Sequence, residues 1–450
     1  MMGRQSAPER LFYDFCLDDH VPGDHPLRRI DAVLDLSELR ARLKPFYSPI
    51  GRPSVDPELM IRMLLVGYCF GIRSERRLCQ EVHLNLAYRW FCGLGLDGGV
   101  PDHSTFSLNR HGRFRQSQAF RCVFESVVRR CMTAGLIGGE GFAVDASVLE
   151  ADASRYRGVS GDEPVDWSDP KLSTRAVREY LAALDPEPDT GGKPPKVISL
   201  SDPASAWTAK ANTRVMFGYG LNYLIDTEHA IIVDVEATPA RTKEEVAATR
   251  TMIERTGERF GLKPERLAAD TAYGTGAFLG WLVDQGIAPH VPVWDKGRRA
   301  DGTFSRHDFT YDREHDRYVC PGGKMLASTG KVHADNTYRY RASSLDCGGC
   351  PLKPRCCPNT PARKIPRNVN EDARDRARLL ATTEPFARSR NQRKKVEMLF
   401  AHLKRHLGVK RLRLRGLSGA RDEFLLAATV QNLKRLAKLS AIPPPEPITA

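Results

Sequence analysis

The sequence lacks an apolar run long enough to cross a membrane. The longest run, Leu59 to Ile72, is interrupted by Arg62 and is shorter than the roughly 20 residues that a spanning helix needs. The N-terminal stretch MMGRQSAPERLFYDF has no apolar core followed by a small-residue cleavage site, so we expect a cytoplasmic protein that is neither secreted nor bound to a membrane. Internal repeats and biased tracts are also missing, which excludes a collagen-like or low-complexity chain.

Acidic residues are outnumbered by basic ones. The 450 residues include 68 Lys and Arg against 55 Asp and Glu, which gives a formal net charge of +13. A hydrophobic content of 41% is ordinary for a globular protein, so a wholly disordered chain is excluded. The length suggests about two to four domains. The positive excess favours a polyanionic partner, with nucleic acid as the first candidate.

Helix-start signals dominate the first part of the chain. The segment SVDPE predicts the start of a mostly apolar helix, and Ser74 predicts the start of a second one. A third, short helical segment follows a polar turn. The second and third helices are short and are compatible with a DNA-reading helix-turn-helix, although any helical bundle shows the same pattern. Its exposed basic residues would be Arg76, Arg77 and Arg89. We predict that residues 1–137 form a helical N-terminal DNA-binding domain.

The pattern changes to alternating strands and helices after this point. A short apolar strand runs into Asp145, and residues 217–225 alternate at period two before HAIIVDVE, which predicts a β-hairpin. A helix, a strand that ends at Asp270, a second helix and a strand over 288–293 follow. This order is typical of a mixed α/β sheet with helices packed on it. We assign residues 138–293 to the first part of this α/β core.

Five of the eleven cysteines lie between residues 320 and 357, in CPGGK and CGGCPLKPRCC. The C-x-x-C pair flanked by Gly and Pro is typical of a tetrahedral zinc site. We predict a structural zinc ion with the ligands Cys320, Cys347, Cys350 and Cys356. A redox-active or merely structural cluster is the alternative. Because loops of this length are uncommon inside a compact domain, we interpret residues 294–385 as an inserted cysteine-bearing β subdomain.

A single acid stands in a strongly basic segment. Residues 386–415 contain eleven Lys or Arg and one acid, Glu397. One helical stripe beside an apolar face contains four residues at successive spacings of three, four and seven positions. They are Arg390, Arg393, Glu397 and Lys404. DNA phosphates against the stripe, with a cation on the acid, would account for this pattern. An ordinary ion pair with Arg393 is the alternative. Residues 386–440 are predicted to complete the core, and 441–450 to form a disordered tail.

Two further acids end predicted strands. Neighbouring strand ends of an α/β sheet can bring Asp145 and Asp270 together, and with Glu397 they would form a three-carboxylate site for magnesium or manganese. Two such ions about 3.5–4 Å apart activate a water or a 3′-hydroxyl and stabilise the leaving oxygen in phosphodiester chemistry. The alternatives are a turn cap at Asp145 and a helix N-cap at Asp270. Asp234, in the predicted hairpin, is a rival acid.

These segments together resemble the DDE transposases of bacterial insertion sequences. VDASVLEADAS resembles the first-aspartate segment of that family, and LAADTAYGT resembles the second. RSRNQRKKVEMLFAHLKRHLGVKRLRLRG resembles a signature of Tyr, Arg, Glu and Lys at spacings of three, four and seven. Arg393, Glu397 and Lys404 match it, whereas Arg390 stands at its Tyr position. PDHSTFS and the hairpin segment also look like family segments.

The resemblance implies a ribonuclease-H-like mixed sheet, interrupted by the cysteine-bearing β subdomain and preceded by an all-α N-terminal domain. It implies that Asp145, Asp270 and Glu397 are catalytic and hold Mg2+ or Mn2+, and that the basic residues of the stripe bind DNA phosphates. The implied partner is double-stranded DNA, at the terminal inverted repeats of the element and at the target. A homodimer would act on it in the bacterial cytoplasm, at the nucleoid. Two alternatives are a non-catalytic DNA-binding regulator derived from a transposase and a ribonuclease-H-like nuclease.

Overall fold

The computed structural model describes residues 15–48, 50–51, 54–184, 195–209, 214–241, 244–294 and 301–440. The chain divides into two compact units. The first comprises residues 1–138, 146–260 and 396–450, and the second comprises residues 139–145 and 261–395. The predicted tail at 441–450 lies outside the described residues. No helix within the described ranges is long and apolar enough to cross a membrane.

The N-terminal part of the first unit is helical, as the helix-start signals predict. Asp56 accepts a hydrogen bond from the Glu58 amide, and the Ser74 hydroxyl accepts one from Arg77, so both residues act as N-caps. The helices are α1 (Leu17–His20), α2 (Pro26–Val33), α3 (Ser37–Leu43), α4 (Pro57–Cys69), α5 (Glu75–Leu84), α6 (Leu86–Phe91), α7 (His103–Asn109) and α8 (Ala119–Thr133).

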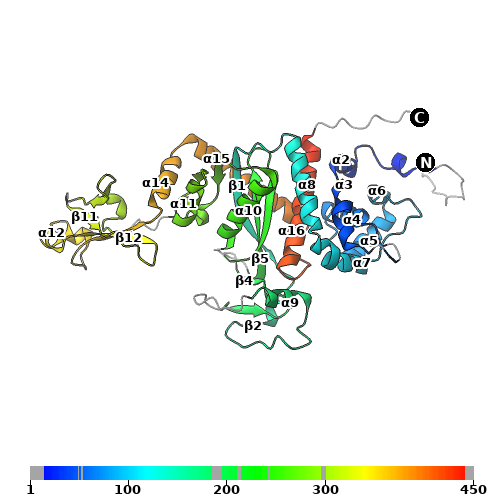
Figure 1. The fold of residues 1–450 in the computed structure, drawn as a ribbon, viewed down its shortest axis with the longest axis horizontal. Helices are drawn as coiled ribbons and strands as arrows, with labels where there is room; N and C mark the ends of the chain where they lie inside the picture. The colour runs from blue at the N-terminus through cyan, green and yellow to red at the C-terminus, as the bar shows by residue number, and fades with distance from the viewer. Residues whose placement is uncertain are drawn as a thin grey trace, which may run out of the picture. The chain divides into compact units, whose positions relative to one another are not determined.

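The core of the first unit is built around α16 (Leu417–Leu439), which packs against α2, α4, α8 and β6 (Figure 1). Several of its polar side chains are buried and have partners. The Asn432 amide accepts a hydrogen bond from the Ile232 N–H at 2.8 Å and donates one to the Ile232 carbonyl at 2.7 Å. Such satisfied polar contacts fix the position of a buried helix that apolar packing alone would specify less sharply.

The predicted hairpin is present in this unit as β5 (Met216–Asp226) and β6 (Ile232–Pro239), which pair antiparallel. β4 (Ala206–Thr208) also pairs with β5, and α10 (Glu244–Phe260) packs on β5 and β6. The smaller elements are α9 (Arg175–Ala182) and the paired strands β2 (Gly158–Ser160) and β3 (Val197–Ser199).

The second unit contains parallel strands. The first residues of β1 (Gly141–Glu150) pair with β7 (Arg266–Ala268), which pairs with β8 (Ala288–His290). Helices α11 (Gly276–Asp284) and α14 (Glu371–Leu380) pack on each other and on β8. Parallel pairing here and antiparallel pairing at the hairpin confirm the predicted mixed α/β architecture with a helical N-terminal region.

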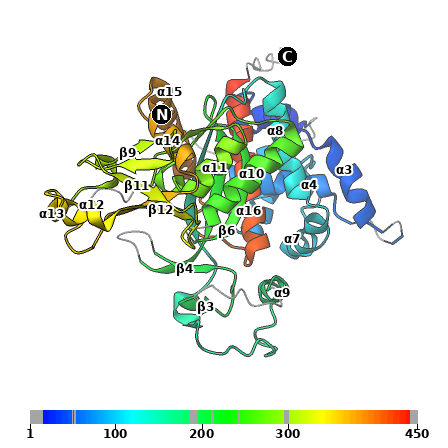
Figure 2. The ribbon, with the colours of Figure 1, turned by 60° about the vertical axis from the view of Figure 1, so that its left-hand side comes forward.

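The second unit also contains a five-stranded antiparallel sheet in the order β13-β12-β11-β10-β9 (Figure 2). Its strands are β9 (Thr310–Asp312), β10 (Arg317–Val319), β11 (Met325–Ser328), β12 (Thr337–Ala342) and β13 (Lys364–Asn368). Two short helices, α12 (Ser344–Gly348) and α13 (Lys353–Cys356), connect β12 to β13. The small buried core of this sheet contains Phe309, Tyr318, Leu326, Tyr340, Ala342, Cys356, Cys357 and Ile365.

A buried carboxylate fixes the start of α14. Glu371 is 1% exposed and forms ion pairs with Arg306 at 2.6 Å, Arg378 at 2.9 Å and Arg374 at 3.0 Å. Burial raises the pKa of Glu371, but the hydrogen bond and charge of Arg306, with the other two guanidinium groups, outweigh it and lower the pKa to about 2. Ionised Glu371 therefore stabilises the fold above the unfolded-state pKa, and this stabilisation is lost as the pH falls towards 2.

We predict that Glu371→Gln strongly destabilises the protein, because three guanidinium groups then lose their buried counter-charge. Breaking a buried ion pair costs about 3 kcal/mol or more. Thermal unfolding followed by circular dichroism at pH 7 should show a fall in Tm of several degrees. The neighbouring Asp372→Asn is the control, since Asp372 pairs with Arg367 but is 64% exposed and contributes little. An equal fall in Tm for both variants would contradict the structural role of Glu371.

Candidate functional site

Asp145 and Asp270 follow the same register position on adjacent parallel strands. Ala143 of β1 lies opposite Ala268 of β7, and each aspartate comes two residues later in its segment. Because parallel strands run in the same direction, both aspartates lie on the same side of this residue pair along the strands. Both side chains are half-buried. The prediction that Asp145 ends a strand is wrong, because β1 continues to Glu150, whereas Asp270 does follow the end of β7. The second unit still places both acids at the same register position of adjacent strands.

Asp270 also caps a turn. Its Oδ1 accepts a hydrogen bond from the Ala272 amide at 2.8 Å, at the start of the 3-10 turn Thr271–Tyr273. The N-cap interpretation of Asp270 is therefore confirmed. This hydrogen bond orients the carboxylate, and a carboxylate has a second oxygen that can accept further contacts.

Asp145 forms an ion pair with the basic helix α15 (Glu384–Arg405). Arg393 Nη1 lies 2.8 Å from Asp145 Oδ2, and the two side chains are 19% and 17% exposed. A charge-assisted hydrogen bond that is partly shielded from solvent is stronger than an exposed one. The Arg393 guanidinium therefore neutralises a candidate catalytic acid within the second unit.

A second contact links the same strand and the same helix. Lys404 Nζ donates a hydrogen bond to Ser147 Oγ at 2.7 Å within the first unit. Ser147 and Asp145 are two residues apart on β1 and therefore share a face of the strand. Sequence reasoning missed Ser147, although this spacing from Asp145 was the signal that could have identified it.

The helix α15 is amphipathic as predicted. Val396, Phe400, Leu403 and, just beyond the helix, Leu407 are buried, whereas Arg390 and Glu397 are exposed. The imidazole of His290, on β8, lies 2.7 Å from the Ser389 hydroxyl of α15. Burial lowers the pKa of His290 to about 4, so the ring is neutral at pH 7. The contact therefore anchors the start of α15 at neutral pH.

The rival acid Asp234 has a structural role. It is 2% exposed and forms ion pairs with Arg121 and, at 2.7 Å, with Arg255. Arg255 also binds Glu236, at 2.8 Å. Asp234 therefore belongs to a buried ion-pair network that joins α8, the hairpin and α10, and it is not part of the candidate site.

The predicted exposure of Arg89 is wrong. Arg89 is 2% exposed, and its guanidinium donates to the backbone carbonyls of Leu96 at 3.0 Å and Gly98 at 2.6 Å, and also to that of Gly95. The loop after α6 folds back over this side chain and provides the acceptors. Arg77 is paired with Glu81 at 3.2 Å. Arg89, one of the three arginines assigned to a helix-turn-helix, therefore stabilises a loop and is not exposed to DNA.

The clustered cysteines converge in the second unit. One cavity is lined by Cys320, Cys347, Cys350, Cys356 and Cys357, and none of these residues forms a disulfide. The Lys324 amide donates a hydrogen bond to Cys320 Sγ at 3.3 Å. Burial, together with the neighbouring Cys357 thiol, raises the pKa of Cys356 to about 11. Within the described ranges, however, no three or more His, Cys, Asp or Glu side chains are arranged so that they could hold a metal ion.

Two family models match the chain. The model described as "Transposase domain (DUF772)" matches residues 15–112, and the model described as "Transposase DDE domain" matches residues 319–437. Both ends of the chain thus match transposase domains, and the protein is an enzyme of this class. It is a DDE transposase of the insertion-sequence type, which cuts and joins DNA. Glu397 lies inside the second match, whereas Asp145 and Asp270 lie outside both.

One similar solved structure is described as a piggyBac transposase synaptic complex with hairpin DNA. It is 9% identical to this chain with a TM-score of 0.35, and the match covers 92% of this chain and 75% of the other. A likeness of this size supports no inference about the fold or the site.

We predict that Asp234→Asn destabilises the protein, because Arg121 and Arg255 then lose a buried counter-charge. The expected cost is about 3 kcal/mol or more, measurable as a lower midpoint in denaturant unfolding. Asp270→Asn is the matched control, because its half-buried side chain retains an oxygen for the Ala272 amide. If Asp234→Asn left the midpoint unchanged, the buried network would not be a structural element.

Proposed function

We propose that Asp145, Asp270 and Glu397 are the catalytic carboxylates of this transposase, on a ribonuclease-H-like core. The observation that carries the proposal is the shared register of the two aspartates, Asp145 within β1 and Asp270 just after β7. Two carboxylates concentrated at one sheet position repel each other unless a cation lies between them or beside them. A bound cation or a basic side chain is therefore expected at this position, and Arg393 provides one.

Glu397 is included because of its place on α15. It follows Arg393 by four residues and precedes Lys404 by seven, so the three side chains share one stripe of the helix. The two outer members contact Asp145 and Ser147, which share one face of β1. Glu397 therefore lies on the stripe of α15 whose two outer members contact β1.

We propose that Arg393, Lys404 and Arg390 bind DNA phosphates. Arg393 is the side chain that can exchange partners, from the Asp145 carboxylate to a backbone phosphate, because guanidinium groups bind both in the same forked geometry. Arg390 is exposed one turn before Arg393 on the same stripe. Phosphate contacts of this kind fix the position of the DNA but do not read its sequence.

Carboxylate oxygens are the ligands that Mg2+ and Mn2+ prefer. The described residues form no ready-made site of three such groups, so the three acids would have to move closer together to hold an ion. When bound, such ions supply Lewis-acid activation of water or of a 3′-hydroxyl and stabilise the leaving oxygen. Asp270 is held in orientation by its capping hydrogen bond, and Asp145 by Arg393. These contacts orient two of the three acids.

We further propose that a homodimer on DNA brings together the two terminal inverted repeats and the target, at the bacterial nucleoid. In this proposal, residues 1–137 read the repeats, 138–293 and 386–440 form the catalytic core, and 294–385 form an inserted subdomain. Coordinated cutting at two ends is the reason to expect two protomers.

Glu397→Gln, Asp145→Asn and Asp270→Asn should each abolish Mg2+-dependent cleavage and strand joining, because each removes an anionic ligand. Binding of a labelled duplex that carries the end of the element should stay within a few-fold of wild type. The control is Glu384→Gln, at the exposed start of the same helix, which should keep full activity. Cleavage by any of the three variants at the wild-type rate would refute its assignment.

The same assay separates the alternatives. A transposase-derived regulator would bind the duplex tightly and leave it uncut even as wild type. A ribonuclease-H-like nuclease would cut duplexes without element ends and would not join the strands.

We also propose that Cys320, Cys347, Cys350 and Cys356 hold a structural zinc ion. The convergence of five unpaired thiols on one cavity and the amide that faces Cys320 Sγ support it. The apolar core of this sheet is small, and small folds commonly depend on a metal or a disulfide for stability. The thiols must move closer together to complete a tetrahedral site.

Protein purified under reducing conditions should contain about one zinc per chain by elemental analysis, and a chelator should lower its Tm. The double variant Cys347→Ser, Cys350→Ser should lose the zinc, whereas Cys16→Ser, at an exposed cysteine outside the cluster, should retain it. The absence of zinc from the wild-type protein would leave the alternative, a purely structural or redox-active cluster.

A further inference from the structure

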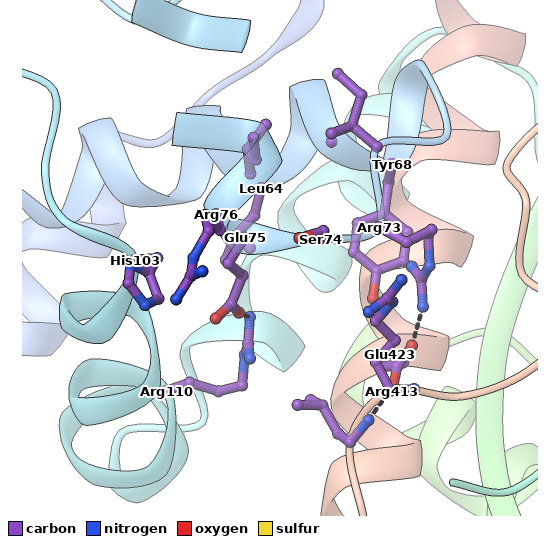
Figure 3. A pocket seen from close by; sticks show the side chains of 14 residues that line it. Leu64, Tyr68, Arg73, Ser74, Glu75, Arg76, His103, Arg110, Arg413 and Glu423 are labelled. Atoms are coloured by element: carbon purple, nitrogen blue, oxygen red, sulfur yellow. Dashed lines mark hydrogen bonds and ion pairs between the residues drawn. The ribbon is translucent and has the colours of Figure 1, made fainter. Parts of the chain in front are cut away.

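A second, basic cavity lies in the first unit. It has a volume of about 300 Å3 and is lined by residues from α4, α5 and α7 and from the connection between α15 and α16 (Figure 3). Its basic residues are Arg73, Arg76, His103, Arg110 and Arg413, and its acidic residues are Glu75 and Glu423.

Both acids of this cavity are already paired. Glu423, 1% exposed, forms an ion pair with Arg73 and accepts hydrogen bonds from the amides of Arg413 and Leu414, each at 2.6 Å. Glu75 forms an ion pair with Arg110. The lining arginines therefore exceed the lining carboxylates by two positive charges.

The uncompensated charge belongs to Arg76 and Arg413. Both are exposed, and the described part of the chain provides neither guanidinium with a carboxylate partner. In Figure 3 they come from opposite walls of the cavity, Arg76 from α5 and Arg413 from the α15–α16 connection. A guanidinium on each side can clamp one anion by charge-assisted hydrogen bonds.

The cavity wall is also short of hydrogen-bond acceptors. The Nε–H groups of Arg73 and Arg110 are buried, and the described residues offer neither an acceptor. The N-terminus of α5 begins at Ser74 in the same wall and adds the positive end of a helix dipole. Charge, donor excess and helix dipole all favour an oxyanion as the occupant.

We propose that this cavity binds a backbone phosphate of duplex DNA between Arg76 and Arg413. DNA is the substrate of the enzyme, and the rim arginines are exposed to a large partner, whereas a small-anion site would enclose them. Arg76 lies in the segment that matches one transposase domain and Arg413 in the segment that matches the other. The contact therefore positions DNA against both segments and is independent of base sequence.

The test is DNA binding by full-length protein in the Glu397→Gln background and without divalent cations, so that no cutting intervenes whichever residues are catalytic. Fluorescence anisotropy gives Kd for a labelled duplex across a salt series. Loss of one phosphate contact should lower the slope of log K against log salt by about 0.9. We expect this change for Arg76→Ala and for Arg413→Ala, with Kd raised roughly equally on element-end and scrambled duplexes.

Arg77→Ala is the matched control, because Arg77 is the next residue on α5, is exposed, and is paired with Glu81 away from the cavity. Its slope should remain near that of the background protein. Equal slopes for the Arg76 and Arg77 variants would overturn the proposal, as would a loss confined to element-end DNA, which would indicate base reading. A rise in Tm with inorganic phosphate alone, abolished by Arg413→Ala, would instead indicate a free-anion site. Because binding and not cleavage is measured, this result is independent of the catalytic assignment.

Discussion

The ion pair between Asp145 and Arg393 is the contact on which the candidate site depends. It joins residues 248 positions apart and fixes the basic helix α15 to the strand that carries the first candidate acid. The Lys404 to Ser147 hydrogen bond repeats the link further along the same two elements. Two contacts between one strand face and one helix stripe determine which side of α15 meets β1. Glu397 lies on α15 between these two anchored positions, which is why it is proposed as the third acid.

This arrangement also explains why an acid occurs in so basic a helix. A site that holds both cations and phosphates needs charges of both signs within a short distance. Carboxylates alone would repel DNA, and arginines alone would not bind a divalent cation. Before DNA binds, Arg393 provides the counter-charge for Asp145. In the proposed complex with DNA and cations, each group would have an alternative partner of the opposite sign.

The sequence predicted the features that depend on local pattern. Strand-end position correctly located Asp270, period-two alternation located the hairpin, and helical spacing located the buried face of α15, whereas the expected strand end at Asp145 was wrong because β1 continues to Glu150. It could not decide on Asp234, because the partner that buries its charge, Arg121, lies 113 residues earlier. Nor could it show that Arg89 is buried, since its partners are backbone carbonyls of a following loop and carry no sequence signal. Long-range partners and backbone acceptors are the information that a pattern of side chains lacks.

The buried ion pair between Arg73 and Glu423 connects the N-terminal helices to the chain that follows α15. Glu423 also accepts hydrogen bonds from the amides of Arg413 and Leu414. Its carboxylate therefore links the turn between α4 and α5 to the connection that leads to α16. A helical region tethered only by a flexible linker could bind DNA without constraining the catalytic helix. Here the N-terminal helices and residues 396–405 of α15 belong to one unit, and that unit also contains Arg413. The proposed phosphate contact at Arg413 would therefore be made by the same unit that contains Glu397.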